Sequence, residues 1–302
     1  LGVAMPVLHW SSATGGGIMA DAAPESCNAE RIGIPGEDRQ MNEDMRYEVR
    51  NGVAWVTLNR PEALNAMNQN ILDGYTQVVR KVEADPEVKV LVFTGSGRAF
   101  SAGADLKYVL SFMGQGDPEK VRTFMRQAYE AFAVVGECEK PTIAAVNGIT
   151  AAGGIELLLA CDLAFAVESA KIGDGHINFG MLPGGGSSIR LPRKISETRA
   201  KYLLLTGELL PARTLLEWGL LNDVVADDEL IPTVERVAAR IAEKSPLATR
   251  LMKQMVDQGL DMPLDRALRT EMEVWEGYGR SDDVVEGLTA FSEKRKPAYT
   301  GR

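Results

Sequence analysis

Residues 1–42 show neither the strand period nor the helix period in their hydrophobic positions, and we expect them to form an irregular, dispensable extension. The regular pattern begins with YEVRNGVAWVTL, in which apolar and polar positions alternate on both sides of Asn51-Gly52. This alternation around an Asn-Gly pair predicts a β-hairpin. Helical spacing then extends from Asn68 to Ala84 and stops at Asp85-Pro86, because the residue before a proline disfavours the helical conformation.

Two further segments each predict a strand, a glycine-bearing turn and the start of a helix. The first runs from Val88 through AFSAGADLK, which ends at Lys107. The second is IAAVNGITAAGGIELLLACD, residues 143–162, in which the first turn of an apolar helix carries a single acid, Glu156. A helix is expected between them, over residues 117–138. Strands that alternate with helices through short connections indicate an α/β layered body.

Helical spacing dominates the last third of the chain. Before it, residues 162–169 predict a strand and residues 173–186 a long glycine-rich loop. A short strand is expected near residues 222–225. The segments that follow predict an α-helical module with helices over residues 228–244, 246–258, 263–276 and 281–294.

Composition narrows the classes of function that the chain can have. It has 302 residues, of which 45% are hydrophobic and 25% charged, as is ordinary for a globular enzyme. The net charge of −9 argues against binding to nucleic acid or to an acidic membrane, since both need a positive surface. Three cysteines without CxxC spacing argue against a disulfide framework and favour a reducing compartment such as the cytoplasm. No run approaches the ~20 apolar residues that a membrane-spanning helix needs.

Familiar nucleotide and hydrolase motifs are absent. The chain contains no GxxxxGK[ST], and GSGRAF at residues 95–100 lacks the last glycine of GxGxxG, which disfavours nucleotide hydrolysis. It also contains no GxSxG. Its two histidines are His9 and His176, so a Ser/His/Asp triad would have to use His176, and no motif supports one.

Two loops, around Ala104 and Gly153, place backbone N–H groups at the start of a helix, where these groups lack internal partners. Paired donors of this kind stabilise the charge that develops on a carbonyl oxygen, and one such donor typically contributes roughly 3 kcal/mol to transition-state stabilisation. Glycine also serves ordinary tight turns, so for either loop alone a purely structural role is the favoured interpretation.

Glu156 and His176 are the candidate proton-transfer groups. Glu156 is either an exposed acid favoured by the helix dipole, or a general base whose pKa is raised by partial burial beside the donors, and the residues alone favour neither. His176 is either a proton shuttle or a loop histidine hydrogen-bonded to the backbone, with the second favoured. Asp105 is expected to cap its helix, and Asp162 and Asp174 are expected to serve turns.

Several motifs, linked in the right order, resemble the crotonase superfamily of enoyl-CoA hydratases and isomerases. The match runs from about Tyr47 to Tyr299 and rests on NRPEALNAMN, AFSAGADLK, AAVNGITAAGGIELLLACD, LPGGGSSIRLPR, TGELLPARTLLEWGLLNDVV and EGLTAFSEKRKPAY. The resemblance implies an α/β fold in which a spiral of ββα units, residues 43–226, carries the active site. It also implies that residues 227–302 form a helical trimerisation module, giving a homotrimer or a dimer of trimers.

The resemblance further implies an acyl-CoA thioester substrate, with no metal and no cofactor other than the coenzyme A of the substrate itself. By motif position, the backbone N–H groups of Ala104 and Gly153 hold the thioester oxygen. The positions implied to contact CoA come from the same motifs and, for the last two, from a neighbouring subunit: Asn65, Ala66, Ala102, Asp105, Leu106, Lys107, Phe291 and Lys294.

In the hydratases of this superfamily, two glutamates flank the enoyl double bond. Glu156 matches the one that directs water to Cβ, whereas the second position falls on His176, so this chain departs from the hydratase pair. We expect a hydratase that adds water to a 2-enoyl-CoA, with Glu156 and His176 sharing the acid–base work. The alternatives are double-bond isomerisation, hydrolytic C–C cleavage of a β-keto acyl-CoA, and a non-catalytic acyl-CoA-binding role.

Overall fold

The computed structural model describes residues 39–113 and 117–302, so most of the expected N-terminal extension, with His9 and Cys27, lies outside the described residues. The last four residues of the expected extension, residues 1–42, form strand β1 (Arg39–Asn42). This strand pairs antiparallel with β2 (Met45–Arg50). The sheet therefore begins earlier than the hydrophobic pattern predicts. A four-residue edge strand is too short to show a period.

The larger sheet contains the predicted hairpin and the buried parallel strands. From β3 onward, neighbouring strands run parallel, and β4 and β6 are almost wholly buried, as expected for continuous apolar runs covered on both faces. Among the described residues its strand order is β1, β2, β3 (Val53–Leu58), β4 (Val90–Gly95), β6 (Thr142–Val146), β8 (Leu163–Val167) and β11 (Asp223–Val225).

A smaller sheet is built from strands of two or three residues. Its order is β10 (Leu210–Pro211), β9 (Lys171–Gly173), β7 (Ile149–Ala151) and β5 (Ala99–Ser101). After β4, β6 and β8 the chain enters the smaller sheet with β5, β7 and β9, and each time it then turns into a helix. This repeat is the ββα spiral that the resemblance implies. The sequence pattern gave turns, not strands, at β5 and β7, and that prediction was wrong.

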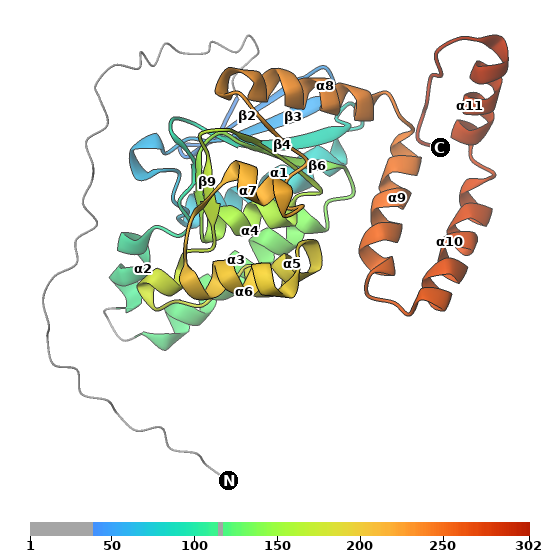
Figure 1. Cartoon of the computed structure of the whole chain (residues 1–302). Coiled ribbons are helices and arrows are strands. Elements are labelled where there is room, and N and C mark those ends of the chain that lie inside the picture. Colours follow the sequence, from blue (N-terminus) through green and yellow to red (C-terminus); the bar gives the residue numbers. More distant parts are fainter. Residues whose placement is uncertain (1–38, 114–116) are drawn as a thin grey trace, which may run out of the picture. The chain divides into compact units, whose positions relative to one another are not determined.

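Helices cover both faces of the larger sheet. Asn68 caps α1 by accepting the N–H of Ile71 at 3.1 Å, and Asp117 caps α3. Figure 1 shows α8 across the larger sheet on the side away from α3 and α4. The helical bounds are α1 (Gln69–Ala84), α2 (Leu106–Met113), α3 (Pro118–Gly136), α4 (Gly153–Ala160), α5 (Ser187–Lys194), α6 (Glu197–Thr206), α7 (Ala212–Glu217) and α8 (Leu230–Ala242), with short 3-10 helices η1 (Pro61–Ala63), η2 (His176–Phe179) and η3 (Asp227–Glu229).

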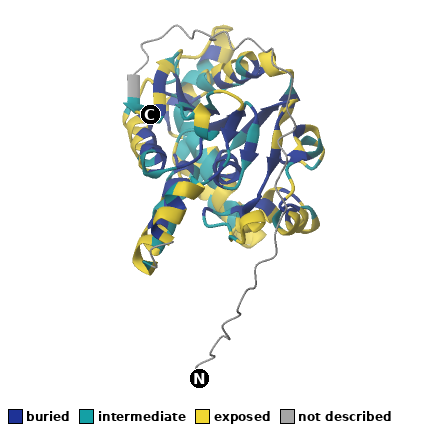
Figure 2. Cartoon of the chain, turned by 90° about the vertical axis from the view of Figure 1, so that its left-hand side faces the viewer, coloured by how far each residue is buried: buried dark blue, intermediate teal, exposed yellow. Residues whose placement is uncertain are grey.

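The core lies between the larger sheet and α1, α3 and α4. Tyr75 of α1 packs edge-on against Phe93 of β4 at 5.7 Å between ring centroids, and it also meets Phe132 of α3. Every residue of α4 is buried. Figure 2 shows the buried residues concentrated in the strands, with exposed residues on the outer helices. No helix in the described part of the chain is long and apolar enough to cross a membrane.

The predicted C-terminal helices are present as α9 (Pro246–Gly259), α10 (Leu264–Tyr278) and α11 (Asp282–Glu293). Neither α9 nor α10 has a buried residue. Lys253 of α9 forms an ion pair with Asp162 at 2.9 Å, and Asp162 also accepts the backbone N–H of Thr142 at 2.7 Å. Asp162 therefore does more than serve a turn, because it joins the end of α4 to β6 and to α9.

Candidate active site

One pocket forms where the two donor loops meet α4 and η2. Four residues singled out in the sequence line it together: Ala104, Gly153, Glu156 and His176. The other lining residues are mainly apolar: Met67, Leu72, Phe124, Met125, Ala128, Phe132, Met181, Leu182, Gly184 and Gly185. The pocket thus combines two helix-start loops, two titratable side chains and a hydrophobic wall, as is usual for a small-molecule site.

The N–H of Ala104 is directed by the segment around Met67. The N–H of Met67 donates to the carbonyl of Gly103 at 2.7 Å, and the carbonyl of Met67 accepts the N–H of Asp105 at 2.9 Å. These two bonds flank Ala104 and make a parallel bridge between Met67 and Ala104. In such a bridge the N–H of the central residue points to the opposite side. Within residues 39–113 and 117–302, this N–H has no protein acceptor. It is therefore available to an oxygen atom in the pocket.

The N–H of Gly153 begins helix α4 and likewise finds no acceptor in the described part of the chain. The residue before it, Ala152, has φ 47° and ψ −118°, a conformation that residues other than glycine rarely adopt. The N–H of Ala152 donates to the carbonyl of Asp174 at 2.6 Å and so holds this turn. The direction of the Gly153 N–H is fixed by a strained and anchored backbone.

The two donor loops pack directly against each other at Gly103. A Cβ atom on Gly103, which has φ +95°, would lie 2.6 Å from the Cβ of Ala152 and 3.0 Å from the nitrogen of Gly153. Any larger residue there would push the loops apart. Glycine at this position keeps the N–H groups of Ala104 and Gly153 on one pocket wall.

Glu156 is buried, with 3% of its surface exposed, which excludes the interpretation of an exposed acid at a helix start. Its Oε1 accepts the N–H of Gly185 at 2.7 Å and that of Ser187 at 3.3 Å. Burial raises the pKa of the Glu156 carboxyl above its ordinary value, although His176 and the two N–H donors act in the opposite direction. A carboxylate whose pKa is raised by burial is a stronger base than an exposed one, which suits it to accept a proton from water.

His176 is also buried, and its partner is a carboxylate. Its Nδ1 lies 3.0 Å from Oδ1 of Asp174. Burial alone would lower the pKa of His176, but the hydrogen bond and the charge of Asp174, with the charge of Glu156, raise it overall. The interpretation of a histidine bonded only to backbone was wrong, and so was the assignment of Asp174 to a turn alone.

The loop implied to contact CoA is held by Arg60 and Asn65. Arg60 donates to the carbonyl of Ala66 at 2.5 Å and to Oδ2 of Asp105 at 3.0 Å. Asn65 is fully buried, and its amide bonds the backbone of Arg60, Ser96 and Ala99. The Asn65 side chain is therefore turned into the loop, and a contact of this residue with CoA stays a prediction. The side chain shapes the loop from inside.

The remaining implied CoA positions differ in their accessibility. Ala102 is half-buried, with its N–H bonded to Leu64, whereas Leu106 and Lys107 are exposed at the start of α2. The side chain of Asp105 accepts the N–H groups of Lys107 and Tyr108, which confirms that it caps this helix. Phe291 and Lys294 lie at the end of α11, outside the pocket lining of their own chain.

The sequence interpretation missed part of the site. Met67 directs the Ala104 N–H, Phe132 closes the wall beside Glu156, and Asp174 holds His176. The contact between Asp174 and His176 had a signal in the sequence, because the two residues are two positions apart in one loop. Within the described ranges, no three or more His, Cys, Asp or Glu side chains are placed to hold a metal ion.

Residues 48–302 match the family model described as enoyl-CoA hydratase/isomerase. The chain belongs to this family. A crotonyl-CoA hydratase from Syntrophomonas wolfei is 37% identical over 261 residues, which cover 86% of this chain and 99% of that protein. An (E)-benzylidenesuccinyl-CoA hydratase from Thauera aromatica is 36% identical over 258 residues, covering 84% and 98%.

Solved structures of enoyl-CoA hydratases share the fold. That of an enoyl-CoA hydratase from Bacillus anthracis superposes with a TM-score of 0.82 at 34% identity, covering 86% of this chain and all of that one. The crotonase fold inferred from the motifs is thereby confirmed. As a member of the enoyl-CoA hydratase/isomerase family, the protein is an enzyme that acts on acyl-CoA thioesters.

Proposed function

We propose that the protein is an enoyl-CoA hydratase that adds water across the double bond of a 2-enoyl-CoA. The observation that carries the proposal is the joint lining of one pocket by the Ala104 and Gly153 N–H groups, Glu156 and His176. The names of its relatives as hydratases support the same reaction. The apolar wall with Phe124 and Phe132 suits the acyl part of such a substrate.

In the proposed reaction, the N–H groups of Ala104 and Gly153 hold the thioester oxygen. Glu156 takes a proton from water as the water oxygen bonds to Cβ, and the π electrons move onto the thioester as an enolate. A proton from His176 then forms the C–H bond at Cα as the enolate collapses. Glu156 returns the proton that it gained to His176 through solvent, so atoms and charge balance.

Product analysis tests this function. We expect purified protein, incubated with crotonyl-CoA and with branched and aromatic 2-enoyl-CoA esters, to consume the conjugated double bond and form a product heavier by one water. Mass spectrometry with H₂¹⁸O identifies the added oxygen. A product of unchanged mass with a shifted double bond would establish isomerisation instead. Cleavage of a β-keto acyl-CoA without any hydration would favour the C–C hydrolase.

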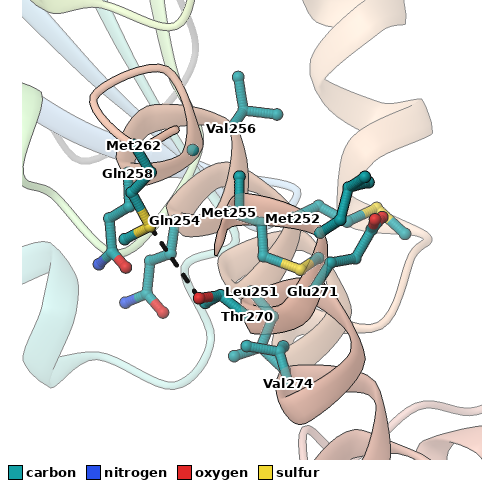
Figure 3. A pocket seen from close by; sticks show the side chains of 13 residues that line it. Leu251, Met252, Gln254, Met255, Val256, Gln258, Met262, Thr270, Glu271 and Val274 are labelled. Atoms are coloured by element: carbon teal, nitrogen blue, oxygen red, sulfur yellow. Dashed lines mark hydrogen bonds between the residues drawn. The ribbon is translucent and has the colours of Figure 1, made fainter. Parts of the chain in front are cut away.

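The C-terminal helices carry large apolar side chains that are exposed within the described part of the chain. Figure 3 shows a pocket lined by α9 and α10, in which Met252, Met255 and Val256 of α9 and Val274 of α10 lie among polar side chains such as Gln254 and Glu271. Large apolar residues of α9, α10, α11 and their connections are more than half exposed: Met252, Val256, Leu260, Leu264, Leu268, Met272, Trp275, Leu288 and Phe291. A concentration of exposed apolar side chains on these helices is typical of an interaction surface. It supports a homotrimer or a dimer of trimers as the working assembly.

We expect Leu268→Asp to dissociate this assembly, because it places a charge on the apolar face of α10. Sedimentation velocity should show a shift from trimer or hexamer towards monomer. Arg266→Asp is the matched control, since it puts the same side chain about 200° around the same helix, on an exposed position. A parent protein that sediments as a monomer, or equal dissociation by both variants, would contradict this role for the C-terminal helices.

A further inference from the structure

Asp174 contacts both the turn that carries the Gly153 N–H and the side chain of His176. Strands β7 and β9 pair in parallel with Ala151 opposite Gly173, so the next residues along, Ala152 and Asp174, lie side by side. There the carbonyl of Asp174 accepts the N–H of Ala152 at 2.6 Å, one residue before the donor Gly153. The backbone of Asp174 thus anchors the turn that directs the Gly153 N–H.

The side chain of Asp174 is turned towards His176. Oδ1 lies 3.0 Å from Nδ1 of the imidazole and also accepts the backbone N–H of His176 at 3.3 Å. Only 1% of Asp174 is exposed, and Oδ2 accepts no hydrogen bond from any described residue. A buried carboxylate with so few donors needs a nearby positive charge. The cation that can supply it here is a protonated His176.

We propose that Asp174 is a positioning residue of the active site, whose carboxylate fixes the tautomer of His176 and keeps its imidazole protonated opposite Glu156. With Nδ1–H directed at Asp174, Nε2 is the nitrogen left to exchange a proton with the substrate. The proposal rests on the proposed function for its catalytic meaning. The contact between Asp174 and His176 itself can be tested without substrate.

Among the described residues, two anions act on His176. Asp174 faces it from the loop after β9, and Glu156 faces it from α4. Helix α6 packs against η2, but its charged side chains are engaged elsewhere: Lys201 with Glu197, and Arg199 over the ring of Trp218. Removing the charge of Asp174 therefore removes the closest anion from His176. Burial, which lowers the pKa of a histidine, then becomes the stronger influence.

Histidine NMR gives the direct test, because the chain contains only His9 and His176. In the full chain, we expect the Hε1 signal that is lost in His176→Ala to titrate with a pKa above the ordinary value of 6.5. Asp174→Asn preserves the shape and an acceptor oxygen but not the charge. We expect it to lower the pKa of His176 by about one unit or more. An unchanged pKa would overturn the proposal.

Steady-state kinetics provide a second test of the role of Asp174. His176 is active here when protonated, so kcat/KM falls as pH rises through its pKa. Asp174→Asn should move this alkaline limb to lower pH and reduce kcat about 10-fold or more at pH 8. In a His176→Ala background, the same substitution should have no further effect. An equal loss in both backgrounds would mean that Asp174 acts only through folding.

Asp228→Asn, at an exposed position in η3, is the matched control and should leave both pKa and profile unchanged. Thermal unfolding of every variant separates loss of structure from loss of charge. Should the protein turn over no enoyl-CoA, the proposed function fails, while the NMR titration still decides whether Asp174 sets the ionisation of His176.

Discussion

Glu156→Gln is expected to lower kcat for hydration by roughly 10²- to 10⁴-fold, the usual contribution of a positioned general base. Glutamine keeps an oxygen that can accept the N–H of Gly185, so the local geometry is retained. It cannot take a proton from water. Affinity for a saturated acyl-CoA, measured by calorimetry, should change little because, in the proposed mechanism, backbone donors hold the thioester.

The pH dependence of the parent supplies a second check on Glu156. The base must be ionised, so kcat/KM rises with pH through the pKa of this carboxyl, which burial places above its ordinary value of 4.5. Glu130→Gln, on an exposed position of α3, is the control and should retain full activity. Parent-like turnover by Glu156→Gln would remove this residue from the reaction.

Gly185→Ala is expected to disable the enzyme by displacing Glu156. A Cβ atom at Gly185 would lie 2.1 Å from the ring of Phe132 and 2.7 Å from Oε2 of Glu156. Both neighbours are buried, so relief requires movement of the wall that positions the base. We expect a loss of about 1–3 kcal/mol in the free energy of unfolding from overpacking. Turnover should fall about 100-fold, since small displacements of catalytic groups are costly.

The adjacent glycine offers the matched control. A Cβ atom at Gly184 would meet the terminal methyl group of Met125, the end of a flexible side chain that can move away. Gly184→Ala should therefore retain most of the stability and turnover. Denaturant unfolding and steady-state kinetics on both variants check the pair. Equal behaviour of the two would show that close packing at Gly185 does not hold Glu156.

The long helices were predictable because the spacing of their apolar residues shows which face is buried. The helices over α1, α3 and α8 to α11 match the predicted ranges within a few residues. Strands β5, β7 and β9 could not be seen in this way. Three residues contain no full alternation, and these strands exist through pairing with segments distant in the sequence.

At the candidate site, the sequence identified residues that line one pocket but not the contacts among them. The donor loops and Glu156 were recognisable from small residues and from one acid in an apolar helix. That Asn65 is buried against the backbone of Ser96 and Ala99, and that the carbonyl of Asp174 meets the N–H of Ala152, depends on how separate turns of the spiral meet. Contacts between distant segments do not change the spacing of apolar residues, so one sequence does not reveal them.

The complete burial of α4 has a consequence for changing the substrate. One side of the pocket is a closed wall, because α4, Gly103 and Gly185 already touch their neighbours and leave no space for new side chains. The lining also includes Met125 and Leu182, which are less enclosed than these groups, so their apolar side chains can be exchanged with less disturbance of Glu156. We therefore expect selection for new acyl groups, in nature or in the laboratory, to change these two positions first.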